Sequence, residues 1–168
     1  ISVVLLGLAL IIAKLLFKNV GFKGYGWMSV TWLSVTLALM IAFVPESTFS
    51  WGGLYFVDAF AHYFKMLLIV SAILVCLASI SYVNKAGYYH AEYFALLIFA
   101  LLGMMAFASA GDLITAYIGL ELMTLSLVVL IAFARGNNLS TEASIKYLLL
   151  SALSSAVMLF GMSLIYGY

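Results

Sequence analysis

Apolar residues gather in six long runs, and the short segments between them hold most of the charged residues. The runs cover residues 1–17, 27–44, 64–83, 93–110, 113–134 and 144–166. About 20 apolar residues cross a hydrocarbon core of roughly 30 Å, so each run after the first is long enough to span a bilayer. The runs lack the alternation of a barrel strand, and a helix satisfies its own backbone inside lipid. The pattern predicts an all-α protein with about six transmembrane helices.

Composition agrees with this pattern. The chain is 67% hydrophobic and 8% charged, whereas a soluble domain averages about 25% charged residues. We therefore expect an integral membrane protein surrounded by the lipid bilayer, and we expect no nucleic-acid partner because no basic stripe is present. The single cysteine, Cys76, provides neither a disulfide framework nor a metal-binding motif. The chain begins without methionine and both ends lie in or beside apolar runs, so we expect a fragment of a longer protein.

Charged residues alternate between the two sides that these helices would connect. One side collects Lys14, Lys18, Lys23, Lys85 and Arg135, whereas the other collects Glu46, Asp58, Lys65 and Asp112. By the positive-inside rule, the basic side faces the cytoplasm or an organellar matrix. His90 and Glu92 are expected at that inner surface as well.

The long outer connection, residues 45–61, is rich in aromatic residues and contains the pair Gly52-Gly53. This composition predicts a hairpin or a short re-entrant loop, with Trp51 and Tyr55 at the level of the lipid headgroups.

Polar residues also mark the predicted helix ends. Asp112 and Ser140 are expected to cap the fifth and sixth helices at their N-termini. Asp58, His62 and Lys65 recur at i, i+4 and i+7, so they share one face at the start of the third helix. We expect these three residues to form a solvated interfacial cluster.

Glu121 is a single carboxylate inside the run 113–134, about nine residues after Asp112 and so roughly 13 Å below the outer surface. A charge near the bilayer centre costs about 2.5–3.5 kcal/mol, so such residues are usually functional. Tyr117 and Thr124 lie one turn to either side and can share a polar face with Glu121. We interpret Glu121 as a proton-carrying acid; alternatively, it only hydrogen-bonds a neighbouring helix and holds the bundle together.

Lys146 lies on the next helix, roughly 9 Å in from the inner surface. Its depth differs from that of Glu121 by about 8 Å, a gap that a long lysine, an acid and water can bridge. A carboxyl that moves relative to a cation alternately binds and releases a proton. Alternatively, Lys146 extends its ammonium to the headgroups, with Glu142 as its partner at i−4.

Several motifs occur in a fixed order. They are Glu92-Tyr-Phe-Ala-Leu-Leu, Leu102-Gly-Met-Met, Asp112-Leu-Ile, Gly119-Leu-Glu121-Leu and Glu142-Ala-Ser-Ile-Lys146-Tyr. With these motifs the chain resembles the antiporter-like membrane subunits of respiratory complex I, weakly over the first 45 residues and strongly from Glu92 onward.

This resemblance implies a 14-helix fold with two inverted repeats and broken helices. Residues 1–91 then correspond to the first three helices, and residues 92–168 to helices four to six, the first half of the first repeat. Glu121 matches a key acid of the family's channel, and Lys146 matches a lysine of its buried charged network. Many relatives have a proline after the glutamate, whereas this chain has Ser126 in its Thr-Leu-Ser-Leu run, which puts any local kink in doubt.

The resemblance also implies a function. The protein would be a proton-translocating subunit of NADH:quinone oxidoreductase without a redox centre of its own. NADH, FMN, iron–sulfur clusters and quinone would be bound by other subunits, and other membrane subunits would be its partners. Its location would be the bacterial cytoplasmic membrane or, alternatively, an organellar inner membrane. The competing interpretations are a cation/proton antiporter, a membrane-bound hydrogenase subunit, and a purely structural membrane subunit.

Overall fold

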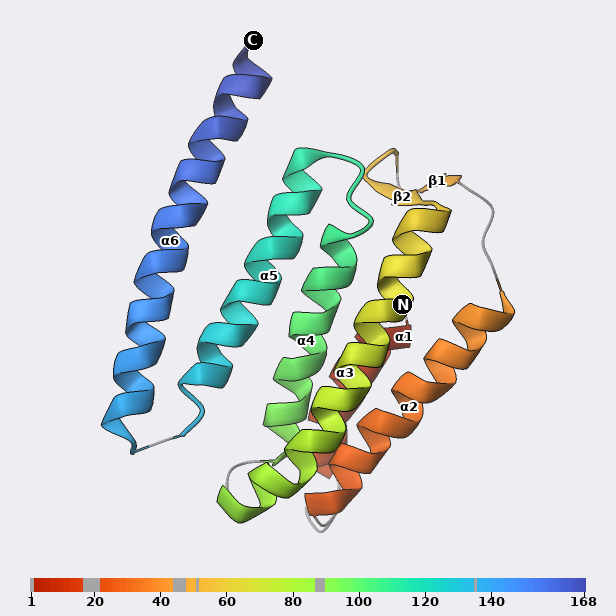
Figure 1. Cartoon of the computed structure of the whole chain (residues 1–168), viewed down its shortest axis with the longest axis vertical. Helices are drawn as coiled ribbons and strands as arrows, with labels where there is room; N and C mark the ends of the chain where they lie inside the picture. The colour runs from red at the N-terminus through yellow and green to blue at the C-terminus, as the bar shows by residue number, and fades with distance from the viewer. Residues whose placement is uncertain (1, 17–21, 44–47, 51, 87–89, 135) are drawn as a thin grey trace.

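The computed structural model describes residues 2–16, 22–43, 48–50, 52–86, 90–134 and 136–168. Within these ranges the chain forms six helices and one small hairpin (Figure 1). They are α1 (Ser2–Leu16), α2 (Phe22–Ala42), β1 (Thr48–Ser50), β2 (Tyr55–Val57), α3 (Ala59–Ala86), α4 (His90–Phe107), α5 (Leu113–Ile131) and α6 (Asn138–Gly167). The prediction of a helical protein with about six helices is confirmed.

Four of the helices, α2, α3, α5 and α6, are long and apolar enough to cross a membrane. The apolar parts of α1 and α4 are shorter, at Ser2–Ile12 and Ala91–Phe107. Helix α4 has 18 residues, as many as the predicted run 93–110, but it begins and ends three residues earlier. By contrast, α3 and α6 extend beyond the predicted runs at both ends, because the residues that flank the runs also adopt helical backbone.

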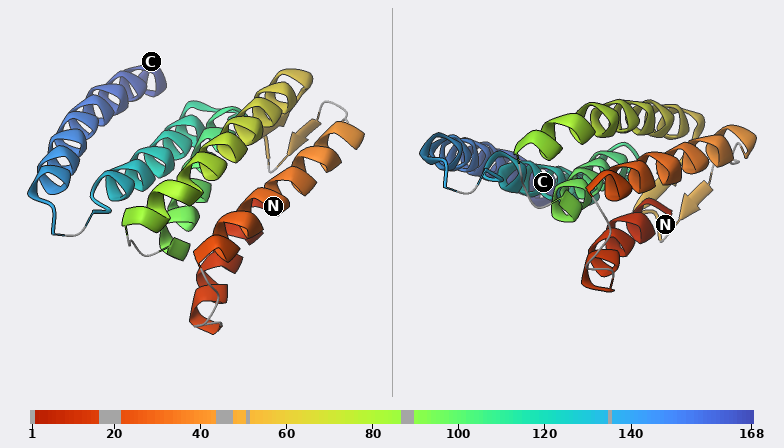
Figure 2. Two further views of the ribbon diagram at one scale, coloured as in Figure 1. Left: turned by 60° about the horizontal axis from the view of Figure 1, so that its bottom comes forward. Right: turned by 90° about the horizontal axis from the view of Figure 1, so that it is seen from below.

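Helix α4 lies at the centre of the bundle and packs against α1, α2, α3 and α5 (Figure 2). Its buried face carries Phe94, Ile98 and Leu101, none of which is exposed. These side chains meet Leu6 of α1 and Leu33 of α2 in one hydrophobic cluster. Helix α6 lies at one edge of the bundle, beside α5 (Figure 1).

The closest helix contact joins α4 and α5 through two glycines. A Cβ atom added at Gly103 would lie 2.5 Å from the backbone nitrogen of Met123 and 2.7 Å from the carbonyl oxygen of Gly119. A Cβ at Gly119 would lie 2.7 Å from the backbone nitrogen of Phe107. Small residues allow such close approach inside a membrane, where packing rather than the hydrophobic effect drives helix association.

The predicted hairpin in the outer connection is confirmed. Strands β1 and β2 pair antiparallel, and Gly52 and Gly53 between them have φ angles of 70° and 93°, which glycine adopts without strain. The backbone amide of Phe56 donates to the carbonyl of Ser109 at 2.9 Å, and that of Gly111 donates to the carbonyl of Leu54 at 2.9 Å. The hairpin is thus bonded to the turn between α4 and α5. Trp51, expected beside it, lies outside the described residues.

One of the two predicted caps is confirmed. Asp112 caps α5 by accepting a hydrogen bond from the amide of Thr115 at 2.8 Å, and this bonding lowers the pKa of the carboxyl. The prediction for α6 was wrong, because Asn137 is the capping residue and accepts from the amide of Leu139 at 3.0 Å. Ser140 lies inside the helix and its hydroxyl donates to the carbonyl of Ile131 at the end of α5.

The helices alternate in direction along the chain. The end of α1 and the starts of α2, α4 and α6 lie at one end of the bundle, and the starts of α3 and α5 lie at the other (Figure 1). This arrangement puts Lys14, in the last turn of α1, at the opposite end from Asp58 and Asp112. For the described residues the alternation agrees with the separation of charges read from the sequence, whereas Lys18, Glu46 and Arg135 lie outside the described residues.

Replacing Gly119 by alanine is expected to destabilise the α4–α5 contact by roughly 1–3 kcal/mol, because the new methyl group would meet backbone atoms that cannot move aside. The measurement is thermal unfolding of the purified full-length protein in detergent. Gly161→Ala is the matched control, since a Cβ there would meet no atom within 4 Å. Equal stability of the two variants would show that the glycine contact does not hold the helices together.

Candidate functional site

Glu121 lies midway along α5 and is half-buried at the contact with α6. The hydroxyl of Ser155 on α6 donates a hydrogen bond to its Oε1 atom. Tyr117, one turn earlier on α5, interacts through its hydroxyl with both Glu121 and Ser155. The carboxylate is therefore held by a hydroxyl group of the neighbouring helix, with Tyr117 close to it on its own helix.

A groove of about 420 Å³ lies between α5 and α6 next to this carboxylate. Its polar lining comes from hydroxyl groups on both helices, those of Tyr117, Thr124, Tyr147, Ser151, Ser154 and Ser155. The predicted polar face is present for Tyr117, whereas the hydroxyl of Thr124 donates to the carbonyl of Leu120 in its own helix at 2.8 Å. Nothing in the sequence places the serines of α6 opposite Glu121, and their position there follows from the packing of α6 beside α5.

Lys146 forms an ion pair with Glu142 one turn earlier on α6. Both side chains are largely exposed, at 69% and 59%. Because Ser155 is level with Glu121 and follows Lys146 by about nine residues, Lys146 lies roughly 13 Å from the carboxylate along the helix axis. Lys146 is thus paired with Glu142, as in the alternative interpretation of this lysine. Its separation from Glu121 is larger than the roughly 8 Å that the sequence predicted.

A second charge pair joins the last turn of α1 to the first turn of α4. The ammonium of Lys14 donates to Oε1 of Glu92, with the two side chains 38% and 42% exposed. Glu92 also lines a cavity of about 380 Å³ bounded by α1, α4 and the end of α5. The sequence predicted both residues at the inner side, and the structure adds that Glu92 is the partner of a lysine from another helix.

The predicted solvated cluster at the start of α3 is wrong for its central member. His62 is 8% exposed, and its Nε2–H donates to the carbonyl of Met40 on α2 at 3.0 Å. Asp58 caps α3 by accepting from the amide of Ala61 at 2.7 Å, and the ammonium of Lys65 lies 5.5 Å from the centre of the Tyr55 ring. These contacts connect helices and hairpin, so the three residues have structural partners.

Comparison with known proteins agrees with this arrangement. Residues 110–168 match the family described as "NADH:quinone oxidoreductase/Mrp antiporter, TM". NADH-quinone oxidoreductase subunit N of Desulforamulus reducens is 53% identical over 115 residues, covering 68% of this chain and 24% of the relative. Subunit N of Rhodobacter capsulatus is 42% identical over 132 residues, covering 79% of this chain and 28% of the relative.

A solved structure extends the similarity to nearly the whole chain. A chain of respiratory complex I from Thermus thermophilus, determined with bound aureothin, superposes with a TM-score of 0.79 and 26% identity. The match covers 99% of this chain and 36% of that chain. The chain described here spans about a quarter of the length of the curated relatives that it matches.

By these matches the chain is similar to the antiporter-like membrane subunits of respiratory complex I. Within that family, its relatives at about half identity over most of the chain are NADH-quinone oxidoreductase subunit N. The resemblance stated from the sequence is confirmed.

Ser155→Ala is expected to remove the interhelical donor to Glu121 and to weaken the α5–α6 contact by about 1 kcal/mol. Infrared spectroscopy of the full-length protein should show a shifted carboxyl band, assigned to Glu121 by its absence in Glu121→Gln. Ser154→Ala is the control, since Ser154 lines the same groove. A carboxyl band that is identical in wild type and Ser155→Ala would contradict the hydrogen bond.

Proposed function

We propose that the protein to which this chain belongs translocates protons as a membrane subunit of NADH:quinone oxidoreductase, and that Glu121 is the residue that carries the proton here. The observation that supports this proposal is the half-buried carboxylate between α5 and α6, bonded to Ser155 and close to Tyr117. A charge at this depth is costly, and such residues line ion pathways more often than they serve packing alone.

The hydroxyl groups around Glu121 suit both protonation states of a carboxyl. A serine or tyrosine hydroxyl donates to an ionised carboxylate, and it can rotate to accept from the same group once that group is protonated. Glu121 can therefore gain and lose a proton without leaving a buried polar atom unpaired, which would cost about 1–3 kcal/mol. Ser155 and Tyr117 are positioning residues in this proposal.

The groove between α5 and α6 gives the proton a route toward the inner side. Tyr147, Ser151 and Ser154 line it at successive levels below Ser155, and Lys146 with Glu142 follows nearer to the start of α6. Hydroxyl groups and ordered water can form hydrogen-bonded chains over such distances. We place Lys146 at the inner entrance of this route rather than in direct contact with Glu121.

The energy for transport would come from other subunits, which would bind NADH, FMN, iron–sulfur clusters and quinone. The complete protein would have 14 helices in two inverted repeats, with residues 1–91 as an N-terminal part and residues 92–168 as the first half of the first repeat. It would lie in a bacterial cytoplasmic membrane with its basic loops facing the cytoplasm, in contact with other membrane subunits. The family match and the subunit N relatives support this assignment.

A second candidate function is exchange of a cation for protons, because the matching family includes Mrp antiporters. The same charged residues would then act without NADH oxidation. A structural role remains the third candidate, since the bond from Ser155 to Glu121 also links two helices.

Glu121→Gln is expected to lower NADH-driven proton translocation in vesicles at least about tenfold with the complex still assembled, because glutamine cannot bind and release a proton. Thr124→Val is the matched control, since its hydroxyl bonds its own helix within the same groove. Full pumping by Glu121→Gln would contradict the proposal, and loss of assembly in that variant would favour the structural role. Sodium-dependent exchange without NADH would favour the antiporter.

Lys146→Met is expected to reduce proton translocation several-fold, whereas Lys146→Arg should retain most of it because arginine keeps the charge next to Glu142. Translocation and assembly would be measured on the same vesicles. Unchanged proton translocation by Lys146→Met would contradict a role of this lysine in the route and would favour a lysine that only contacts the lipid headgroups.

A further inference from the structure

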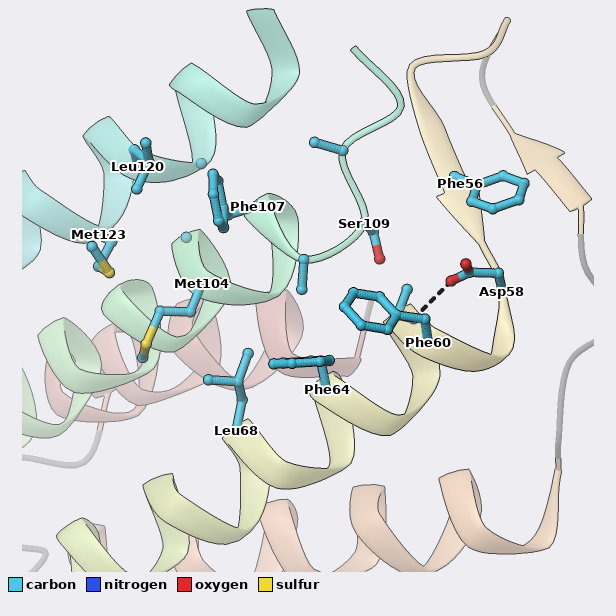
Figure 3. A pocket seen from close by; sticks show the side chains of 15 residues that line it. Phe56, Asp58, Phe60, Phe64, Leu68, Met104, Phe107, Ser109, Leu120 and Met123 are labelled. Atoms are coloured by element: carbon cyan, nitrogen blue, oxygen red, sulfur yellow. Dashed lines mark hydrogen bonds between the residues drawn. The ribbon is translucent and has the colours of Figure 1, made fainter. Parts of the chain in front are cut away.

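The outer hairpin holds the residues that lead into α5. The backbone amide of Phe56 donates to the carbonyl of Ser109, and the amide of Gly111 donates to the carbonyl of Leu54, both at 2.9 Å. An antiparallel bridge lies between these two bonds. Residues 109–111 therefore run beside β2 like a third strand, and Figure 3 shows the strand of Phe56 next to the turn of Ser109. We call this contact the hairpin clamp.

The clamp is tightest at Gly111. A Cβ atom added there would lie 2.1 Å from the carbonyl oxygen of Gly53 and 3.2 Å from the carbonyl carbon of Leu54. Gly111 does not share the positive φ angle of Gly52 and Gly53. Glycine is thus required at position 111 for space and not for backbone conformation, so a side chain there would push the hairpin and the turn apart.

The clamp is continuous with the start of α5. Asp112 follows Gly111 directly and caps the helix by accepting from the amide of Thr115 at 2.8 Å. The helix then continues to Ile131 without a proline, so its hydrogen-bonded backbone is unbroken. Glu121 lies on this helix about nine residues, or roughly 13 Å, from the cap. A displacement at the clamp is therefore carried along α5 to the carboxylate.

The hydrogen-bond partner of the carboxylate belongs to a different helix. Ser155 lies on α6, and the backbone bonds of the clamp join the hairpin to the turn before α5. A shift of α5 at the clamp therefore changes the distance between Glu121 and Ser155. A methyl group at Gly111 needs a contact of at least 3.4 Å in place of 2.1 Å, an increase of about 1.3 Å. A hydrogen bond stretched by this amount is essentially lost.

We propose that the hairpin clamp positions the proton site, with Gly111 as its positioning residue. By fixing the start of α5, the clamp keeps the carboxylate of Glu121 within hydrogen-bond distance of Ser155. The inference rests on the proposed function where it concerns proton translocation, whereas the hydrogen bond itself is measurable without transport. A change at the outer surface that moves the hairpin would then alter the bonding of a carboxylate roughly 13 Å below it.

The test compares Gly111→Ala with wild type in the full-length protein, assembled in its complex and reconstituted in vesicles. Infrared spectroscopy reports the carboxyl band of Glu121, assigned by its absence in Glu121→Gln. We expect Gly111→Ala to shift this band in the same direction as Ser155→Ala does, and to lower NADH-driven proton translocation several-fold. A hairpin that only covers the turn would leave the band in place. Gly161→Ala is the matched control, since its new methyl group would meet no atom within 4 Å.

A double variant tests whether the clamp acts through Ser155. If it does, Gly111→Ala combined with Ser155→Ala should give no larger band shift than Ser155→Ala alone, because the bond is already absent. Effects that share one interaction are not additive, whereas independent effects are.

A second measurement does not depend on the folding of Gly111→Ala. A protease site inserted between Gly52, which is exposed, and Gly53 allows the hairpin to be cut after the complex has assembled. Cutting should shift the Glu121 band in the same direction, and the uncut sample of the same protein is the control. Where Gly111→Ala does not assemble, the cut protein decides.

Three outcomes would overturn the proposal. An unchanged Glu121 band in the deciding sample would mean that the hairpin yields and does not govern α5. Additive shifts in the double variant would mean that the clamp affects Glu121 by a route other than Ser155. An equal shift in Gly161→Ala would mean that the band responds to any added methyl group. Full translocation by Glu121→Gln would instead contradict the proposed function and would leave the band shifts as they are.

Discussion

The close approach of α4 and α5 at Gly103 and Gly119 is the contact on which the rest of the arrangement depends. The two backbones touch there, so the rotation of α5 about its own axis is fixed. Each helical residue turns by about 100°, so Glu121, two residues after Gly119, points about 200° away from α4. The glycine contact thus directs the carboxylate toward α6, where Ser155 donates to it. A wider α4–α5 spacing would leave the orientation of Glu121 undetermined.

Polar side chains inside the bundle mostly find partners within their own helix. Ser29, Thr36, Ser79 and Ser126 each donate to a carbonyl one turn earlier, at distances of 2.7–2.9 Å. Such bonds satisfy a hydroxyl in lipid without linking helices. Glu121 cannot bond to the backbone of its own helix in this way, because a carboxylate accepts hydrogen bonds and the helix amides around it already donate to carbonyls. Its dependence on a neighbouring helix is what makes the site sensitive to helix position.

The sequence predicted what depends on composition and local chemistry. Six helices, the hairpin at 45–61 and the cap at Asp112 follow from apolar run length, the glycine pair and the preference of aspartate for helix starts. The prediction failed where a neighbouring polar residue competes for the same role. Asn137 caps α6, and the hydroxyl of Ser140 bonds the carbonyl of Ile131 instead. It also failed where tertiary packing decides. Nothing along the chain indicates that Lys14 of α1 pairs with Glu92 of α4, or that Ser155 lies level with Glu121.

The hydrogen bond from Ser140 to the carbonyl of Ile131 ties the start of α6 to the end of α5. Helix α6 packs beside α5, and the turn between them is short, so any tilt of α6 would pivot about this end (Figure 1). Ser155 lies about 15 residues from that end, a lever arm of roughly 22 Å. A tilt of about 5° would move its hydroxyl by about 2 Å, far enough to break a hydrogen bond. The hydrogen bond from Ser155 to Glu121 therefore depends on the angle between α6 and α5.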